Sequence, residues 1–569
     1  MPQSNYQITQ LPDYRMPKSL LPFLVAGAVA CGGPPSAPRT PAKADTSPST
    51  DKPPGLMTGL GTHHHPITAS AEAQRFFDQG FTLVYAFNHE EAVRSFQRAA
   101  ALDPTAAMPH WGIAWALGPN YNLDIDDARA RQAWNAIEQA KSLAATAPAH
   151  ERAYIDSLAV RYSNDAKADR AALARRYSAA VGALMRQYPD DLDAATLYGE
   201  SLMNLRPWQL WSLDGAPAPG TEELVAVLES VLRRDPNHIG ANHYYVHAVE
   251  ASRTPARALP SAGRLATLAP AAGHLVHMPA HIYQRTGDYA SAARANLAGA
   301  EADRVYLKTV PADSFYGLAY YSHNLHFLTD SHMMQGRLRD SQEAAAELAE
   351  RLTPHADMMP MIESMVIEPM TVLLRFGRHA ELLEVAAPPA GRPVMRAWWH
   401  FARGVALART ARIDEAVRER ADFDRTRAQV PESALFGGTG LESAKTILQV
   451  AGVVLDARLA WARCEQGRAV ELWKQAVAAA DRVAYDEPPI WFYPLRESLG
   501  AALVLAGRPG EAERVFRDDL ERHPRNPRSL FGLHESLVKQ GKQVDAASVR
   551  PLFEDAWRNA DTMLTLDAL

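Results

Sequence analysis

Seven of the 20 histidines lie between residues 240 and 330, in three short stretches of regular spacing. Within each stretch, successive histidines are three or four residues apart, which is the separation of neighbours on one face of a helix. Neutral imidazole is the commonest nitrogen ligand, and it suits zinc, copper, iron and nickel. The spacing therefore predicts rows of metal-ligating side chains in "GANHYYVHAVEAS", in "GHLVHMPAHIYQRTGDY" and at His323 and His326.

A repeat interval of 34 residues relates the first two stretches. Pro236 in "RRDPN" and Pro270 in "TLAPA" would each end a helix, and they are 34 residues apart. The histidines recur at the same interval, so their imidazoles would lie side by side on adjacent helices, which pack about 8–10 Å apart. The equivalent pairs are His243 with His277 and His247 with His281.

The third stretch fits the same frame if the chain carries an insertion. Gly336 lies 49 residues after the equivalent turn glycine, Gly287, so we expect 49 − 34 = 15 additional residues within 302–318. In this frame the third helix presents His323, His326 and Asp330 in turn. Three neighbouring helices would then offer histidine at one equivalent position: His243, His277 and His326.

The predicted ligand set can supply three imidazoles to each of two metal ions. Its members are His243, His247, His277, His281, His323 and His326. This count resembles that of paired-copper sites that activate oxygen, and it favours copper. Zinc is an alternative, because three histidines leave an open position and lower the pKa of bound water to about 7. Glu250 is then the predicted catalytic residue, as a general base or as the partner that orients an imidazole. Iron held by histidines with Glu250 or Asp330 is a third possibility.

Helical repeats must position these side chains. The segment 71–104, "AEAQRFFDQGFTLVYAFNHEEAVRSFQRAAALDP", has small residues at Gly80 and Ala92, Phe96 between them and a helix-ending proline, Pro104. It resembles the tetratricopeptide repeat, a 34-residue helix–turn–helix unit. Similar units recur over most of 71–569, for example "QRTGDYASAARANLAGA" and "LAGRPGEAERVFRDDLERHP". The resemblance implies an all-α helical-repeat superhelix, an α-solenoid, whose first helices line a concave groove.

The histidine set and the repeat scaffold allow functions of different classes. The leading hypothesis is a metal-dependent enzyme, a copper oxidoreductase with its site in the groove. A zinc-dependent hydrolase could use the same histidines. A non-enzymatic scaffold of the cell envelope, or a metal-handling protein, needs no reaction at all. The expected partner is a small-molecule substrate or a peptide in the groove.

Composition narrows the choice of partners. The 569-residue chain is 47% hydrophobic and has a net charge of −6, with a pI of about 6.4. No basic stripe or nucleic-acid motif is evident, so we expect no nucleic-acid partner. Charges of both signs are mixed along the chain, as is typical of solvated helix faces. Two cysteines, Cys31 and Cys464, provide no disulfide framework.

The N-terminal sequence has the layout of an export signal. "MPKSLLPFLVAGAVACGG" has a positive start, a short apolar run and small residues before Cys31. It resembles a bacterial lipoprotein signal, which implies a lipidated Cys31 as the only membrane contact and a periplasmic or outer-membrane-associated location in the cell envelope. An uncleaved anchor is the alternative. The expected parts are a signal segment (1–31), a Pro/Ser/Thr-rich tether (32–60), an N-terminal array (61–350) and a C-terminal array (351–569).

The sequence allows two alternative roles for each of two further segments. "GTHHHPITAS" places His63, His64 and His65 before the first repeat, either as a polar linker or as a strap that adds a ligand or a lid contact to the groove. The Pro/Gly-rich stretch 204–220 contains Arg206, Trp208 and Trp211 and departs from repeat spacing. It could cap the groove or seal an irregular helix pair.

Overall fold

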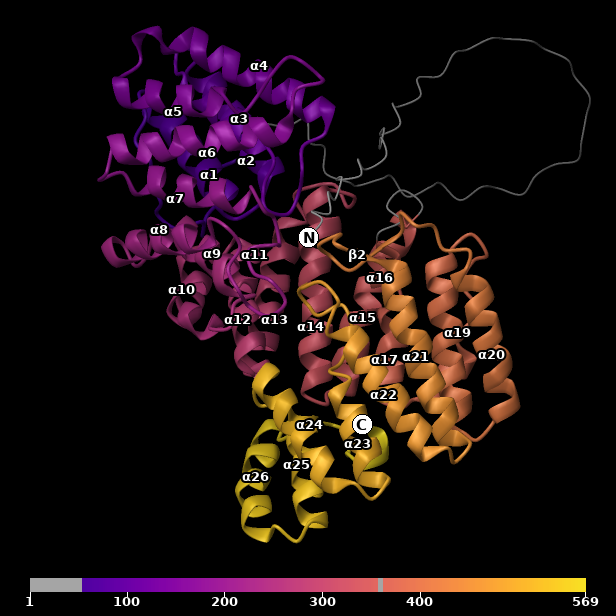
Figure 1. The fold of residues 1–569 in the computed structure, drawn as a ribbon. Helices are drawn as coiled ribbons and strands as arrows, with labels where there is room; N and C mark the ends of the chain where they lie inside the picture. The colour runs from indigo at the N-terminus through magenta and orange to yellow at the C-terminus, as the bar shows by residue number, and fades with distance from the viewer. Residues whose placement is uncertain (1–53, 357–361) are drawn as a thin grey trace, which may run out of the picture. The chain divides into compact units, whose positions relative to one another are not determined.

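The computed structural model describes residues 54–356 and 362–569, all within one compact unit that extends from Ser47 to Leu569. The export-signal segment, Cys31 and the tether up to residue 53 lie outside the described residues. Helices dominate the described chain, and its β-structure is one hairpin of β1 (Leu435–Phe436) with β2 (Glu442–Ser443), besides two isolated bridges (Figure 1). The predicted all-α helical-repeat fold is confirmed.

The helices follow one another in pairs along the chain. The first half contains α1 (Ala71–Tyr85), α2 (His89–Leu102), α3 (Met108–Leu117), α4 (Asp127–Leu143), α5 (Ala149–Ala159), α6 (Arg170–Gln187), α7 (Leu192–Met203), α8 (Thr221–Arg234), α9 (Ile239–Val249), α10 (Leu259–Leu268), α11 (Gly273–His277), α12 (Pro279–Thr286), α13 (Tyr289–Tyr306) and α14 (Ser322–Met334). The second half contains α15 (Leu338–Leu352), α16 (Glu363–Val366), α17 (Glu368–Arg375), α18 (His379–Glu384), α19 (Pro393–Arg409), α20 (Ile413–Arg427), α21 (Ala444–Ala462), α22 (Gln466–Ala480), α23 (Arg496–Leu505), α24 (Pro509–Arg522), α25 (Pro527–Lys539) and α26 (Gln543–Ala556).

The first repeat shows why its small residues matter. Phe96 on α2 is fully buried, and its ring lies directly over Gly80 of α1 and Gly112 of α3. A Cβ atom at Gly80 would come within 2.7 Å of that ring, so no larger residue fits without displacement. Ser70 caps α1 by accepting a hydrogen bond from the Ala73 amide. These contacts close the predicted helix pair around one aromatic side chain.

Two large hydrophobic cores hold the arrays. One gathers buried side chains between residues 60 and 320, and the other between 333 and 569. The change of core therefore comes before the predicted boundary at 350/351, near α14. The end of the chain also reaches the middle of the sequence, because Thr562 Oγ1 donates to the Gly336 carbonyl at 2.9 Å.

Packing against the array begins before residue 61, where the expected tether was to end. Leu60 is buried, and the Ala271 amide donates to the Gly59 carbonyl at 2.9 Å. The Gln79 side chain bonds both the Met57 amide and the Gly55 carbonyl. Residues 55–60 are thus attached to α1 through Gln79 and to the turn before α11 through the Ala271 amide.

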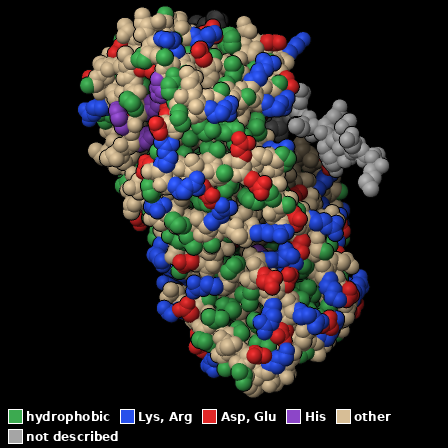
Figure 2. Space-filling model, turned by 60° about the vertical axis from the view of Figure 1, so that its left-hand side comes forward, with side chains coloured by type: hydrophobic (Ala, Val, Ile, Leu, Met, Phe, Trp, Pro, Cys, Tyr) green, Lys and Arg blue, Asp and Glu red, His purple; other side chains and the backbone are tan. Residues whose placement is uncertain are grey.

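The surface carries charges of both signs, as the sequence predicts. On the face shown in Figure 2, Lys and Arg side chains alternate with Asp and Glu. Within the described residues, no helix combines the length and the apolar character that crossing a membrane requires.

Candidate metal centre

Three helical segments bring the predicted histidines together. Helix α9 carries His243 and His247 and ends before Glu250. Pro279 divides the second histidine-bearing helix into two parts, so that α11 ends at His277 and α12 carries His281. A π-helical turn, Gly317–Tyr321, precedes α14 and sets the rotation at which His323 enters the centre. Such turns are frequent at functional sites.

The second histidine group consists of His277, His281 and His323. His277 Nε2 lies 2.9 Å from His281 Nε2 and 3.1 Å from His323 Nε2. Two nitrogens bound 2.0–2.1 Å from one tetrahedral ion are about 3.3 Å apart. One ligating atom from each residue lies within 4.8 Å of the others. The three side chains are therefore placed to share a metal ion.

Hydrogen bonds fix the tautomers of two of these imidazoles. His277 Nδ1 faces Asn296 Oδ1 at 2.6 Å, while the amide nitrogen of Asn296 donates to Ser331. His281 Nδ1 faces Glu250 Oε2 at 2.5 Å. Because both partners are acceptors, each Nδ1 carries the proton, and each Nε2 presents a lone pair. Two lone pairs facing each other at 2.9 Å repel unless a cation lies between them.

The first histidine group consists of His243, His247 and His274, again with ligating atoms within 4.8 Å of one another. His243 Nδ1 donates to the Tyr85 carbonyl at 2.6 Å, so its Nε2 lone pair points to His274 Nε2 at 3.2 Å. His247 Nδ1 donates to Glu250 Oε1 at 2.9 Å, and its Nε2 is buried without a hydrogen-bond partner. This group is likewise compatible with one metal ion.

Glu250 connects the two histidine groups. One carboxylate oxygen accepts from His247 of the first group and the other accepts from His281 of the second. Burial opposes ionisation, but the neighbouring His281 and His247 lower the pKa of Glu250, so the carboxylate stays charged. Carboxylates that hold the distal N–H of a ligating histidine orient the ring and raise its basicity.

Burial disfavours the protonated form of several of these imidazoles. All members of the two histidine groups except the partly exposed His323 are buried. Burial first, and the neighbouring imidazoles second, hold the pKa values of four of them well below the usual range of histidine: His243, His274, His277 and His323. Neutral imidazole is the form that binds metals. Buried, neutral and prearranged imidazoles are compatible with a metal site.

The structure brings five of the six predicted ligands together and places the sixth elsewhere. His326 lies one turn beyond His323, and its Nε2 faces Glu368 Oε1 at 3.4 Å. His274 occupies the place in the first group that would complete three ligands. Counting along the repeat already placed His274 on the same helix face as His277 and His281. It could not show that a π-helical turn before α14 directs His326 away from the other histidines. Asp330 belongs to neither group and contacts Gln284.

An aromatic shell, which the spacing did not predict, surrounds the first group. The Phe87 ring lies with its centroid 4.5, 5.7 and 5.3 Å from the rings of its three histidines. Phe87 has a φ of 56°, whereas glycines with positive φ occupy the corresponding turns at Gly287 and Gly336. Such a conformation costs an aromatic residue about 1–2 kcal/mol. Tyr121 and Trp208 lie against His247, at 5.3 and 5.8 Å.

The histidine segment 63–65 folds as a strap, but it joins neither histidine group. His65 Nδ1 lies 2.8 Å from Asp193 Oδ2, and His63 and His238 approach Asp193 Oδ1 at 3.2 Å each. The Tyr85 hydroxyl donates to the same carboxylate at 2.8 Å. These residues form the Asp193 cluster. It is connected to the candidate metal centre through Tyr85, whose carbonyl holds His243, and through His238, which caps α9.

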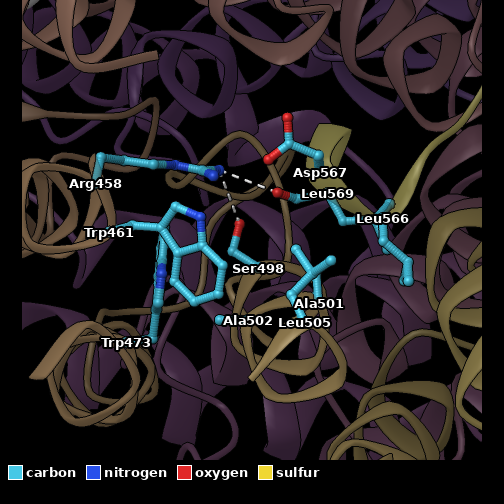
Figure 3. A pocket seen from close by; sticks show the side chains of 10 residues that line it. All are labelled: Arg458, Trp461, Trp473, Ser498, Ala501, Ala502, Leu505, Leu566, Asp567 and Leu569. Atoms are coloured by element: carbon cyan, nitrogen blue, oxygen red, sulfur yellow. Dashed lines mark hydrogen bonds between the residues drawn. The ribbon is translucent and has the colours of Figure 1, made fainter. Parts of the chain in front are cut away.

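A separate small pocket lies near the C-terminal helices. Arg458 bonds Ser498 and the Leu569 carbonyl across it, and Trp461 and Trp473 form a wall (Figure 3). No histidine lines this pocket. Asp567 is the one carboxylate side chain that lines it, so the pocket does not provide the set of several ligands that a metal centre needs.

Comparison with known proteins identifies no family. No model of a known protein family matches the chain, and no curated protein sequence matches it. Solved structures of the human IFIT1 dimer are similar: the complex with m7Gppp-AAAA has a TM-score of 0.34 and 12% identity, covering 87% of this chain and 92% of that chain. The complex with PPP-AAAA has a TM-score of 0.34 and 11% identity, with the same coverage. The likeness concerns the helical-repeat fold.

These structures correct one expectation from the sequence. We expected no nucleic-acid partner because the chain lacks a basic stripe, yet the similar IFIT1 structures contain m7Gppp-AAAA and PPP-AAAA, which are nucleic-acid ligands. The exclusion of nucleic acid is therefore wrong.

Proposed function

We propose that the protein is a metal-dependent oxidoreductase with a dinuclear copper centre in its helical-repeat array. The first histidine group would hold one ion and the second group the other. The ions, when bound, supply two redox centres that can pass electrons from a substrate to an oxidant. The chain's own residues hold the imidazoles in their ligating tautomers and exclude water from the centre.

One observation carries this proposal. His277 and His281 direct their Nε2 lone pairs at each other across 2.9 Å, and their Nδ1 atoms are committed to Asn296 and Glu250. Protonation of one ring would remove the repulsion, but burial disfavours an imidazolium at His277. A bound cation removes it without that cost, and copper accepts an all-imidazole ligand set.

The role of Glu250 favours copper over a zinc hydrolase. A general base needs a free oxygen that can take a proton from the attacking water. Both carboxylate oxygens of Glu250 already accept hydrogen bonds from ring nitrogens, of His247 and His281. Glu250 therefore supports the proposed centre as the residue that orients one ligand in each group, and these two contacts hold it away from the role of a general base.

The proposed location is the cell envelope. The lipoprotein-type sequence ending at Cys31 and the tether that follows it support export and lipid attachment. An exported protein meets copper more readily than a cytosolic one. Mass spectrometry of the N-terminal peptide of the native protein should find a diacylglycerol-modified Cys31. An unmodified peptide that begins at Met1 would contradict the assignment.

Oxygen uptake tests the proposed reaction class. Protein loaded with copper should consume dioxygen in the presence of a reducing substrate, and the zinc-loaded protein should not, because zinc has no redox chemistry. His277→Ala should abolish the activity by removing the central ligand of the second group. His534→Ala is the matched control, since His534 pairs with Glu535 in the C-terminal array and belongs to no group of possible metal ligands in the described chain. Equal uptake by wild-type and His277→Ala protein would refute the proposal.

A further inference from the structure

The two histidine groups differ in how they meet their surroundings. All three members of the first group are buried, and the aromatic rings of Phe87, Tyr121 and Trp208 cover them. In the second group, His323 is partly exposed. His326, one turn further along α14, is partly exposed too, with 15% of its side chain accessible. An external molecule would therefore approach the centre along this edge of α14.

Carboxylates surround that edge. We call the set the acidic edge; it comprises Asp330, Glu368, Asp486 and Glu487, together with His326. Glu368 on α17 faces His326 directly, at 3.4 Å. Asp330 and Asp486 are close enough to His326 for their charges to act on it. Glu487 lies close enough to Asp330 and to Glu250 to feel both charges.

The acidic edge has more carboxyl groups than cationic side chains that could pair with them. Arg375 is committed to Glu497 through two contacts, at 2.5 and 3.1 Å. Arg285 donates to the Glu250 and Ser252 carbonyls, and its guanidinium lies over the Tyr485 ring. His326 remains as the nearest partner of Glu368.

Two buried carboxylate oxygens of the edge have no hydrogen-bond partner among the described residues. They are Glu368 Oε2 and Glu487 Oε2, on side chains that belong to residues only 6% and 2% exposed. A buried carboxylate oxygen without a partner costs free energy unless a ligand supplies a donor. These atoms point to a donor that binds from outside the chain.

The geometry suits an organic cation better than a third metal ion. Groups with three ligating atoms within 4.8 Å of one another occur elsewhere in the described chain, but none of them includes His326, Glu368 or Asp330. A metal ion needs its ligands in one compact shell. An ammonium group instead donates three hydrogen bonds to acceptors that can be further apart.

We infer that the acidic edge is a binding site for a primary ammonium group, which delivers an amine-bearing substrate to the second histidine group. The role of the bound amine as a substrate rests on the proposed oxidoreductase function. Binding itself depends only on the carboxylates. Glu368 would accept a charge-assisted hydrogen bond through its free oxygen, and Asp330 and Asp486 would add attraction at longer range.

The ionisation of the edge supports this inference. Burial raises the pKa of Asp330 to about 7 and that of Asp486 to about 6. Burial and the charge of Glu250 raise the pKa of Glu487 as well. Carboxylates that ionise reluctantly in isolation ionise readily when a cation binds beside them. A bound ammonium ion would thus release protons from the edge.

Three probes of equal size and different charge test the site: propylammonium, propionate and 1-propanol. Calorimetric titration of the full, copper-loaded protein at pH 7 should show binding of propylammonium, and at least tenfold weaker binding of the other two. Glu368→Gln should weaken propylammonium binding about tenfold, the usual effect of losing one charged hydrogen bond. Asp486→Asn provides a second variant in case Glu368→Gln does not fold. Glu419→Gln on α20, which removes the carboxylate that faces His400 of α19, should leave the affinity unchanged.

The outcomes separate this inference from the function proposed above. If propionate or 1-propanol binds as tightly as propylammonium, or if both edge variants bind propylammonium like wild type, the acidic edge is not an ammonium site. If the chain takes up no copper and the metal-free protein still binds propylammonium in a Glu368-dependent way, the oxidoreductase proposal fails and the ammonium site stands. Copper absorption that shifts on propylammonium binding would support both.

Discussion

Histidines gather in two neighbouring regions of the molecule, and they are arranged for different purposes. In the metal centre, imidazole lone pairs face one another, as between His277 and His281. In the Asp193 cluster, the ring nitrogens of His63, His65 and His238 face a single carboxylate. The comparison shows that the number of histidines alone does not distinguish a candidate metal site. The lone pairs that face one another make the first region the stronger candidate, although His65, Asp191 and Asp193 also lie close enough together to hold an ion.

Removal of one imidazole from each region should separate the two roles most strongly. His277→Ala deletes the nitrogen that faces both other ligands of the second group, so at least one metal ion per chain should be lost. His65→Ala removes a buried ring from the Asp193 cluster and should leave metal content unchanged. Elemental analysis of the two purified variants measures the difference. Equal metal loss in both would show that the strap belongs to the metal centre.

The carboxylates of the two regions should respond in opposite ways. Asp193→Asn removes the charged acceptor of His65 and Tyr85 and the negative charge beside His63, and it should lower the free energy of unfolding by about 3 kcal/mol. Chemical denaturation of the metal-free protein measures that loss. Metal affinity should change little, provided that the Tyr85 carbonyl stays in place. A variant as stable as wild type would contradict the structural role of Asp193.

Glu250→Gln should act chiefly on the metal. The amide keeps one oxygen as an acceptor but presents an N–H group to the other imidazole, so His247 or His281 loses its preferred tautomer. Loss of such an orienting carboxylate typically costs 10- to 100-fold in metal affinity. Competition with a chelator of known affinity measures this. If affinity is unchanged, Glu250 does not orient the ligands.

The smallest expected effect is a pH dependence of stability in the Asp193 cluster. Burial opposes protonation of His63, but Asp193 outweighs it and raises the pKa of His63 above 6.5. The raised pKa in the folded state means that His63 contributes stability below pH 6.5 and that this contribution is lost as the pH rises through the folded-state pKa. His63→Asn should therefore be less stable than wild type at pH 5.5, by about 1 kcal/mol, and should approach wild type at pH 9. Thermal unfolding of metal-free samples checks the trend, and an equal difference at both pH values would contradict it.

The repeat sequence allowed the helical fold to be predicted because its determinants are local. Phe96 between Gly80 and Gly112, and the turn glycines Gly287 and Gly336, follow directly from helix-pair packing and positive φ. The phase of His243 and His277 could be counted for the same reason. Parts of the candidate centre depend on distant segments, and no spacing rule contains them: the Tyr85 carbonyl beside His243 is separated from it by 158 residues.

The exchange of His326 for His274 shows where counting along the chain stops working. The prediction counted repeat positions as if the residues after the insertion formed a regular α-helix. The chain instead forms a π-helical turn at Gly317–Tyr321. One additional residue per turn rotates the following side chains by about 100°. His323 consequently faces the centre and His326 faces Glu368. Only the folded structure shows which of two in-phase histidines completes a group.

Metal content of the protein purified from its native envelope tests the central claim most directly. The opposed lone pairs of the second group and the parallel arrangement in the first group predict two metal ions per chain, with copper as the main element. Wild-type protein that contains far less than one metal ion per chain, and that takes up none when copper is supplied, would contradict the account.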